Sequence, residues 1–282
     1  MNEHPPNRRS AMIFPALAPE RFDDALSAEP DIAVFDLEDG TAVERRAEAR
    51  AVISPVFLRE APFLKYLRIN HPRSIDGVRD MAALLDWTTP PDGLLLPKIE
   101  SAEEVRQVAE TVCAVHRGME LMPIIESPSG LEAVHEIAGA APEVVTLLLG
   151  SDDLSGTVGS ERDWDALAYA RGRVAAAAGG AGIEAMDGAF YDPTDEAGLL
   201  EELRRVASMG FTGKASYYPG QIPHIHAAFT PSAEAIEESR RILETAAADP
   251  IGNTRLDGRM VNAAIVKRAR RLLAIAERRG VA

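Results

Sequence analysis

The chain has 282 residues and is 46% hydrophobic, so it can bury a full core and is not an extended disordered protein. Its 44 acidic residues outnumber the 30 lysines and arginines, giving a formal charge of −14. This charge argues against nucleic acid or an anionic membrane as a partner, but it leaves room for a small anionic substrate.

A single cysteine, Cys113, excludes an internal disulfide and a cysteine-based zinc cluster. It lies in an apolar helical stretch, so we expect a core residue, with a nucleophile as the alternative. The polar start over residues 1–9 lacks the apolar core of a signal peptide, and no apolar run approaches the length of a membrane span. We therefore expect a cytoplasmic protein.

Short apolar runs alternate with helical patterns from one end of the chain to the other. The expected strands cover residues 11–14, 32–36, 66–69, 94–96, a run ending at 126, a run ending near 150, 183–186 and 211–214. The expected helices cover residues 19–26, 42–52, 74–86, a stretch from 101, 131–138, 165–178 and 195–209. Ser101 and Glu104 have the spacing of a capping box at a helix start. Gly179 and Gly180 are expected to end the helix over residues 165–178.

Eight strand–helix units without a linker predict an α/β protein, a (β/α)8 TIM barrel that forms a catalytic domain over residues 1–230. An open doubly wound sheet is the alternative, although no Gly-x-Gly-x-x-Gly follows the first strand. Residues 231–282 are expected to form a C-terminal helical extension, with helices over 232–247 and 261–279 and a loop over 249–258. This extension is predicted to cap the barrel mouth or to contact a neighbouring subunit.

Acidic residues follow the apolar strands at the points where the strands end. They are Asp36, Glu38 and Asp39, then Glu126, then Asp152 and Asp153, and then Asp187. In a parallel barrel the carboxyl ends of the strands form the face that carries the active site. Carboxylates gathered there repel one another unless a cation lies between them, so the pattern predicts a divalent-metal site.

Glu126 and Asp153 are the best candidates for metal ligands, because they come from neighbouring strands. Two carboxylates completed by water and substrate oxygens suit Mg²⁺, with Mn²⁺ as an alternative. A helix-capping role for Glu126 has about equal weight, and Asp152 is expected to cap a helix or to support the ligands. The order of the acids thus predicts the pair of metal ligands but does not decide the roles of the neighbouring acids.

Arg68 ends the third strand, where a guanidinium can bind a substrate carboxylate or a developing enolate oxygen. An ion pair with Glu38 or Asp39 is a compatible alternative. Strand alternation places Asp36 and Glu38 on one side, so at least one of these acids is expected to orient Arg68 or a metal-bound water.

Eight short motifs occur in a family-like order along nearly the whole chain. They are Arg9-Ser10 with Phe14-Pro15, Phe35-Asp36-Leu37-Glu38-Asp39-Gly40, Arg68-Ile69-Asn70, Leu96-Pro97-Lys98-Ile99-Glu100, Ile125-Glu126-Ser127-Pro128-Ser129-Gly130, Gly150-Ser151-Asp152-Asp153-Leu154, Asp187-Gly188, and Gly210-Phe211-Thr212-Gly213-Lys214 with Pro219-Gly220-Gln221. In this order the chain resembles the citrate lyase β-subunit/malyl-CoA lyase-like family of the HpcH/HpaI aldolase superfamily.

The resemblance implies a Mg²⁺-dependent carbon–carbon lyase that is a homotrimer or homohexamer. Its substrate would be a small hydroxy or keto acid, such as a 3-hydroxy acid or its CoA thioester, cleaved or formed through a metal-stabilised enolate. The resemblance places the metal ligands on Glu126 and Asp153 and the substrate arginine on Arg68. We take Arg68, Glu38 and Asp39 as the candidate catalytic residues.

Two segments depart from the family pattern. Tyr217-Tyr218-Pro219 stands where the family commonly has Ile-His-Pro, and at least one tyrosine is expected to contact substrate, with core packing as the alternative. Asn262 stands where thioester-cleaving members have an aspartate, and an amide cannot exchange a proton at neutral pH. Tyr218 and Asn262 are therefore candidate substrate-binding residues. The alternative functions are an acyl-CoA thioesterase and a specialised or non-catalytic ligand-binding paralogue.

Overall fold

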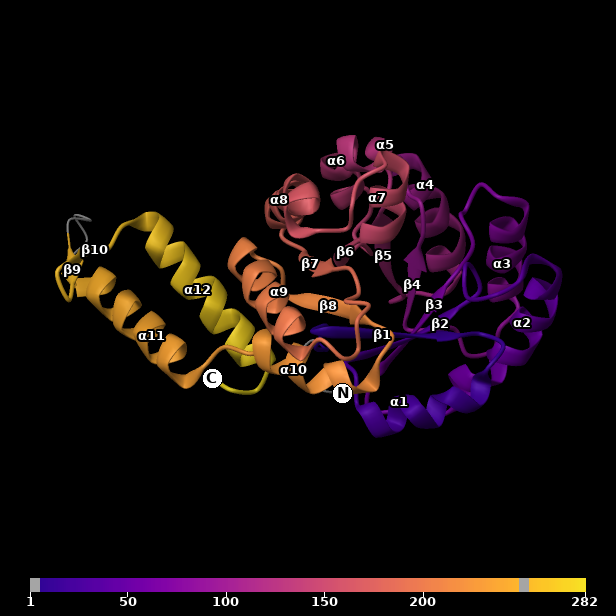
Figure 1. Ribbon diagram of the computed structural model, residues 1–282, viewed down its shortest axis with the longest axis horizontal. Helices are drawn as coiled ribbons and strands as arrows, with labels where there is room; N and C mark the ends of the chain where they lie inside the picture. The colour runs from indigo at the N-terminus through magenta and orange to yellow at the C-terminus, as the bar shows by residue number, and fades with distance from the viewer. Residues whose placement is uncertain (1–5, 249–253) are drawn as a thin grey trace. The chain divides into compact units, whose positions relative to one another are not determined.

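The computed structural model describes residues 6–248 and 254–282 of the chain (Figure 1). The chain divides into two compact units. One runs from Arg8 to Ile225, and the other comprises the described residues before Arg8 and those from His226 onward. Residues 1–5 of the predicted polar start lie outside the described residues.

Eight parallel strands of the larger unit form a closed barrel, in which β8 pairs with β1. The strands are β1 (Ser10–Pro15), β2 (Ile32–Asp36), β3 (Leu64–Arg68), β4 (Gly93–Leu96), β5 (Glu120–Ile125), β6 (Thr146–Leu149), β7 (Glu184–Asp187) and β8 (Gly213–Ser216). The predicted (β/α)8 TIM barrel is confirmed. The open doubly wound sheet is excluded, because every strand of the barrel has two neighbours.

Helices follow each strand of the barrel (Figure 1). They are α1 (Phe22–Ala28), α2 (Arg46–Ile53), α3 (Ile75–Leu85), α4 (Ala102–Val108), α5 (Pro128–Glu132), α6 (Val134–Ala138), α7 (Ser151–Val158), α8 (Trp164–Ala181), α9 (Glu196–Met209) and α10 (Ile222–Ala228). Short 3-10 turns cover Pro19–Arg21, Val43–Arg45, Ser54–Leu58 and Pro219–Gln221, and a π-helical turn covers Ala109–Cys113.

The ends of two helices can be compared with the ends predicted from the sequence. The Glu104 half of the predicted capping box is present at the start of α4, where the Glu104 carboxylate accepts the backbone N–H of Ser101 at 3.1 Å. The predicted stop at Gly179 and Gly180 is wrong, because α8 continues to Ala181 and ends at Gly182, whose φ of 75° is the left-handed conformation. Glycine ends a helix where the chain adopts positive φ, and neither earlier glycine does so.

The barrel interior is filled by alternate residues of the strands. Inward-facing Ile13, Val34, Met122, Leu148 and Met186 belong to one buried cluster. At the amino-terminal end of the strands, the Glu120 carboxylate accepts hydrogen bonds from Arg8 and from the Tyr66 hydroxyl. Cys113 is buried, and burial raises the pKa of its thiol to about 12, as expected of a core residue rather than a nucleophile.

In the smaller unit α11 (Ala233–Ala248) and α12 (Ala263–Arg278) pack side by side (Figure 1). Part of the predicted loop, residues 249–253, lies outside the described residues. After it, β9 (Arg255–Leu256) and β10 (Arg259–Met260) form an antiparallel hairpin. Its turn is Asp257-Gly258, with φ of 50° and 80°, as a tight hairpin requires. None of the helices in the described part of the chain is long and apolar enough to cross a membrane.

Candidate active site

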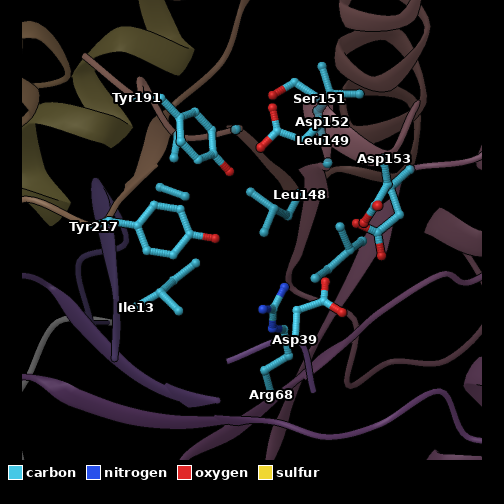
Figure 2. Close-up of a pocket in the computed structure, with 16 residues that line it drawn as sticks. Ile13, Asp39, Arg68, Leu148, Leu149, Ser151, Asp152, Asp153, Tyr191 and Tyr217 are labelled. Carbon is cyan, nitrogen blue, oxygen red and sulfur yellow. The ribbon is translucent and has the colours of Figure 1, made fainter. Parts of the chain in front are cut away.

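A cavity of about 130 Å³ lies at the carboxyl ends of the barrel strands. Its charged wall includes Arg68, Asp39, Glu126 and Asp153, and Figure 2 shows Arg68, Asp39 and Asp153 around the cavity with Tyr191 and Tyr217. Thus the cavity brings together the two predicted metal ligands, the predicted arginine and Asp39. Glu38, the other candidate catalytic acid, is not among the lining residues.

Arg68 is held by a two-pronged ion pair with Asp36, its register partner on the neighbouring strand. Arg68 Nε and Nη2 each donate to the Asp36 carboxylate at 2.6 Å. The same carboxylate accepts the backbone N–H groups of Glu38 at 2.9 Å and Gly40 at 2.7 Å. Although burial opposes the charge, the Asp36 hydrogen bonds and the charges of Asp36 and Glu38 raise the pKa of Arg68. Asp36 therefore orients Arg68, as expected for one of the three acids.

Because Asp36 occupies the fork of the guanidinium, Nη1 is the nitrogen of Arg68 that Asp36 leaves free. This nitrogen lies 3.3 Å from Glu38 Oε2, which agrees with the expected ion pair to Glu38. Asp39 pairs instead with Lys98, whose Nζ lies 3.6 Å from it. Lys98 Nζ also donates to Glu38 Oε1, so Glu38 lies between two cations.

Lys98 also positions Glu126 through its backbone. Its φ of 54° is unusual for a residue with a side chain, and its N–H donates to Glu126 Oε1 at 2.6 Å. Glu126 is 4% exposed, and burial, followed by the charges of Glu38 and Asp153, raises its pKa to about 8. Neighbouring carboxylates that raise the pKa of Glu126 in this way favour a cation beside it.

Asp153 lies in the first turn of α7, a helix that the sequence analysis did not predict. Its side chain is exposed, and it is close enough to Glu126 to raise the pKa of that residue. Asp152 does not cap the helix, since its Oδ1 accepts a hydrogen bond from Arg162 Nη1 at 2.8 Å. Asp187 does not line the cavity. Its side chain points out of the barrel, and outside the barrel Lys214 and Arg171 donate hydrogen bonds to it at 2.6 Å and 3.0 Å. This strand-end acid therefore belongs to a structural ion cluster and not to the cavity.

The residues at the cavity fit the Mg²⁺ ion that the family resemblance implies. In the described residues, no group of three or more His, Cys, Asp or Glu side chains is arranged to hold a metal ion. The Glu126–Asp153 pair thus offers two carboxylates, and the remaining positions would be taken by water and substrate oxygens. Mg²⁺ keeps several waters and is commonly bound by one or two carboxylates, so the donor set suits it.

Two tyrosines form the opposite wall of the cavity, and one of them was not predicted. Tyr217 follows β8 and lines the cavity, whereas Tyr218 is not among the lining residues and bonds Ser216 through its backbone. Tyr191, which the sequence analysis missed, lies in the loop after β7, with its ring centroid 5.5 Å from that of Tyr217. No motif marks a loop position of this kind.

Lys98 belongs to one of the eight motifs, but its role as the anchor of Glu126 was not predicted. Asn262 lies in the smaller unit, where its side chain accepts the backbone N–H of Ile265 at 3.0 Å and caps α12. An asparagine is a favourable residue at this position for helix formation alone.

Comparisons with known proteins agree with this fold and site. Residues 9–219 match the HpcH/HpaI aldolase/citrate lyase family. The chain is 30% identical to the citrate lyase subunit beta of Escherichia coli K12, over 97% of this chain and 95% of that protein. It is 31% identical to an L-malyl-CoA/beta-methylmalyl-CoA lyase of Cereibacter sphaeroides, over 97% and 96% of the two chains.

A solved structure of CitE from Mycobacterium tuberculosis, in complex with magnesium, acetoacetate and coenzyme A, superposes with a TM-score of 0.79. It is 30% identical and covers 98% of this chain and 100% of its own. The predicted family and the predicted lyase class are confirmed. The chain belongs to the HpcH/HpaI aldolase/citrate lyase family and is a carbon–carbon lyase.

Proposed function

We propose that the protein is a Mg²⁺-dependent lyase that cleaves or forms a carbon–carbon bond in a small 3-hydroxy acid or its CoA thioester. The observation that carries the proposal is the Glu126–Asp153 pair, in which burial and neighbouring charge raise the pKa of Glu126 to about 8 beside the fixed guanidinium of Arg68. Relatives named for citrate, malyl-CoA and citramalyl-CoA cleavage support the substrate class.

The charge at the cavity supports the dependence on a metal. In the described part of the chain, six carboxylates lie at or next to it, namely Asp36, Glu38, Asp39, Glu126, Asp152 and Asp153, against three cations, Arg68, Lys98 and Arg162. Three negative charges remain when all these groups are ionised, and they repel an anionic substrate. A divalent cation removes most of this repulsion, so substrate binding should need the metal.

Each residue has a separate task in the reaction. A Mg²⁺ ion held by Glu126 and Asp153 would supply the positive charge that stabilises an enolate as the carbon–carbon bond breaks. Arg68 Nη1 adds positive charge at the same wall, and the Asp36 fork keeps it fixed, so no reorganisation is needed during the reaction. Glu38 holds Lys98, whose backbone N–H fixes Glu126.

The segment 231–282 is proposed to contact a neighbouring subunit in a homotrimer or homohexamer. By the family resemblance, Asn262 stands where thioester-cleaving members have an aspartate. Because an amide cannot donate a proton at neutral pH, we expect the protein to cleave malyl- and citramalyl-CoA poorly.

A coupled screen tests the proposal. Release of pyruvate, glyoxylate, oxaloacetate or acetyl-CoA is followed over a panel of hydroxy acids and acyl-CoA thioesters, with and without Mg²⁺. We expect Mg²⁺-dependent release that Glu126→Gln abolishes and that Glu136→Gln, an exposed glutamate on α6, leaves unchanged. Release of free CoA without a keto acid would identify a thioesterase instead, and cleavage that persists without a divalent metal would refute the metal-dependent mechanism.

A further inference from the structure

Tyr191 and Tyr217 place two hydroxyl groups on one wall of the cavity. Their ring centroids lie 5.5 Å apart at an interplanar angle of 45°. In Figure 2 both hydroxyls point into the cavity, across from Asp153. Burial raises the pKa of each phenol, so both stay protonated at neutral pH and remain neutral donors.

The surrounding structure holds both rings in place. Tyr217 faces inward by strand alternation after Ala215. The Tyr191 hydroxyl lies within hydrogen-bonding reach of Asp152 and of Tyr217, and the guanidinium of Arg162 lies 4.0 Å from the centre of its ring. Arg162 also neutralises Asp152, so the negative charge beside Tyr191 is compensated.

Two side chains from the β8 region hold the backbone that carries Tyr191. Lys214 Nζ donates to the carbonyl of Gly188 at 2.6 Å, and Gln221 Nε2 donates to the carbonyl of Phe190 at 3.1 Å. Lys214 is fully buried. The tyrosine pair is therefore preorganised, which lowers the entropic cost of binding a ligand there.

Apart from these hydroxyls and the Asp152 carboxylate, which Arg162 neutralises, this part of the wall is apolar, with Ile13, Leu148, Ala189 and Ala215. The positive charge of Arg68 is close enough to Tyr217 to lower the pKa of that phenol against the effect of burial. A fixed hydroxyl donor next to the cation of Arg68 favours an anionic acceptor, and Tyr191 holds the Tyr217 hydroxyl in place. A ligand that leaves such donors unpaired loses affinity.

We propose that Tyr191 and Tyr217 form a subsite that binds a carboxylate at the end of the substrate remote from Glu126 and Asp153. The enzyme would then prefer short hydroxy- or keto-diacids to monoacids of the same carbon length. This inference rests on the proposed function, because the other end of the substrate is assigned to the metal-binding carboxylates. A cavity of about 130 Å³ suits a compact acid.

Calorimetric titration with malate and with 2-hydroxybutyrate, each as both enantiomers and in the presence of Mg²⁺, tests the subsite. The two acids share the hydroxy-acid end, and a methyl group replaces the remote carboxylate in the second. We expect malate to bind about tenfold or more tightly, as a charge-assisted hydrogen bond implies. In Tyr217→Phe and Tyr191→Phe, malate affinity should fall towards that of 2-hydroxybutyrate, whose own affinity should change by no more than about twofold.

Tyr169→Phe is the matched control, because Tyr169 is exposed on α8 and bonds Arg173. Its preference for malate should equal that of the unmodified protein. Equal binding of the two acids by the unmodified protein, or a preference that survives in both Phe variants, overturns the subsite. Mg²⁺-dependent binding of both acids would in that case still support the proposed function. Failure to bind either acid overturns the subsite alone, and the coupled screen with acyl-CoA thioesters then decides the proposed function separately.

Discussion

Gly150→Ala should weaken Mg²⁺ binding without removing a ligand. A Cβ at Gly150 would lie 2.4 Å from Glu126 Oε2 and 2.5 Å from Glu126 Cβ, whereas ordinary contacts lie between 3.4 and 4 Å. The backbone at Gly150, with φ of −87°, accepts alanine without strain, so the effect is steric. Glu126 must therefore move by about 1 Å or the barrel must open locally.

The move is resisted, because the N–H of Lys98 holds Glu126 at 2.6 Å. Overpacking of this kind costs about 1–3 kcal/mol of folding free energy. Displacement of a ligand's support typically costs about 10–100-fold in metal affinity, so we expect a loss in that range.

The assay is Mg²⁺ titration by calorimetry together with thermal unfolding of the metal-free protein. Gly156→Ala is the matched control, since Gly156 lies inside α7 and an added Cβ meets nothing within 4 Å. It should raise stability by about 0.5–1 kcal/mol and leave Mg²⁺ affinity unchanged. Unchanged Mg²⁺ affinity in Gly150→Ala would show that the position of Glu126 does not determine metal binding, and the reasoning would fail.

The remaining predictions concern the metal, the proton, the arginine and the smaller unit. Glu126→Gln and Asp153→Asn should each weaken Mg²⁺ binding at least about tenfold in calorimetry, and full affinity in both would contradict the site. The pKa of Glu126 rises from 4.5 to about 8 in the folded, metal-free protein, so folding takes up a proton between these values and the stability of that protein should fall as pH rises through them. For the same reason Mg²⁺ binding should release a proton below about pH 8 and tighten as pH rises, which titration in buffers of different ionisation enthalpy measures; a pH-independent affinity is the contrary result. Arg68→Lys should abolish activity in the coupled assay, because lysine cannot keep the two-pronged contact to Asp36, and retained activity would contradict this role. Asn262→Asp should raise malyl-CoA cleavage about 10²-fold or more if the missing proton donor limits that reaction, and efficient cleavage that the substitution leaves unchanged would refute this. Light scattering should show a trimer or hexamer, and a monomer at micromolar concentration would refute the proposed role of residues 231–282.

The barrel could be predicted because its strands are buried on both faces and read as continuous apolar runs. β2 was predicted to the residue, and the other strands within a few residues. α7 was missed because Ser151–Val158 is rich in small and acidic residues and has no apolar stripe. The stop after α8 was misplaced because composition alone does not show which of several glycines adopts positive φ.

The sequence predicted which residues gather at the candidate site, but not which acid forms an ion pair with which cation. Strand alternation placed Asp36 and Glu38 on one side, but the choice of Asp36 as the partner of Arg68 depends on the register between β2 and β3. The outward direction of Asp187 follows from the inward direction of Met186, which the sequence analysis did not use. Tyr191 lies in a loop, where no periodicity predicts direction.

The strand-end carboxylates differ in whether a cationic side chain forms an ion pair with them. Asp36 is paired with Arg68, Glu38 with Lys98 and Asp152 with Arg162, through short contacts to fixed side chains. Glu126 accepts one backbone N–H, and its nearest charged neighbours include Glu38 and Asp153, which together with burial raise its pKa. A cation placed between Glu126 and Asp153 relieves this repulsion without competing with any existing ion pair. Within residues 6–248 and 254–282 no side chain forms an ion pair with Glu126 or Asp153, and this, rather than the number of acids on the face, supports the proposed metal position.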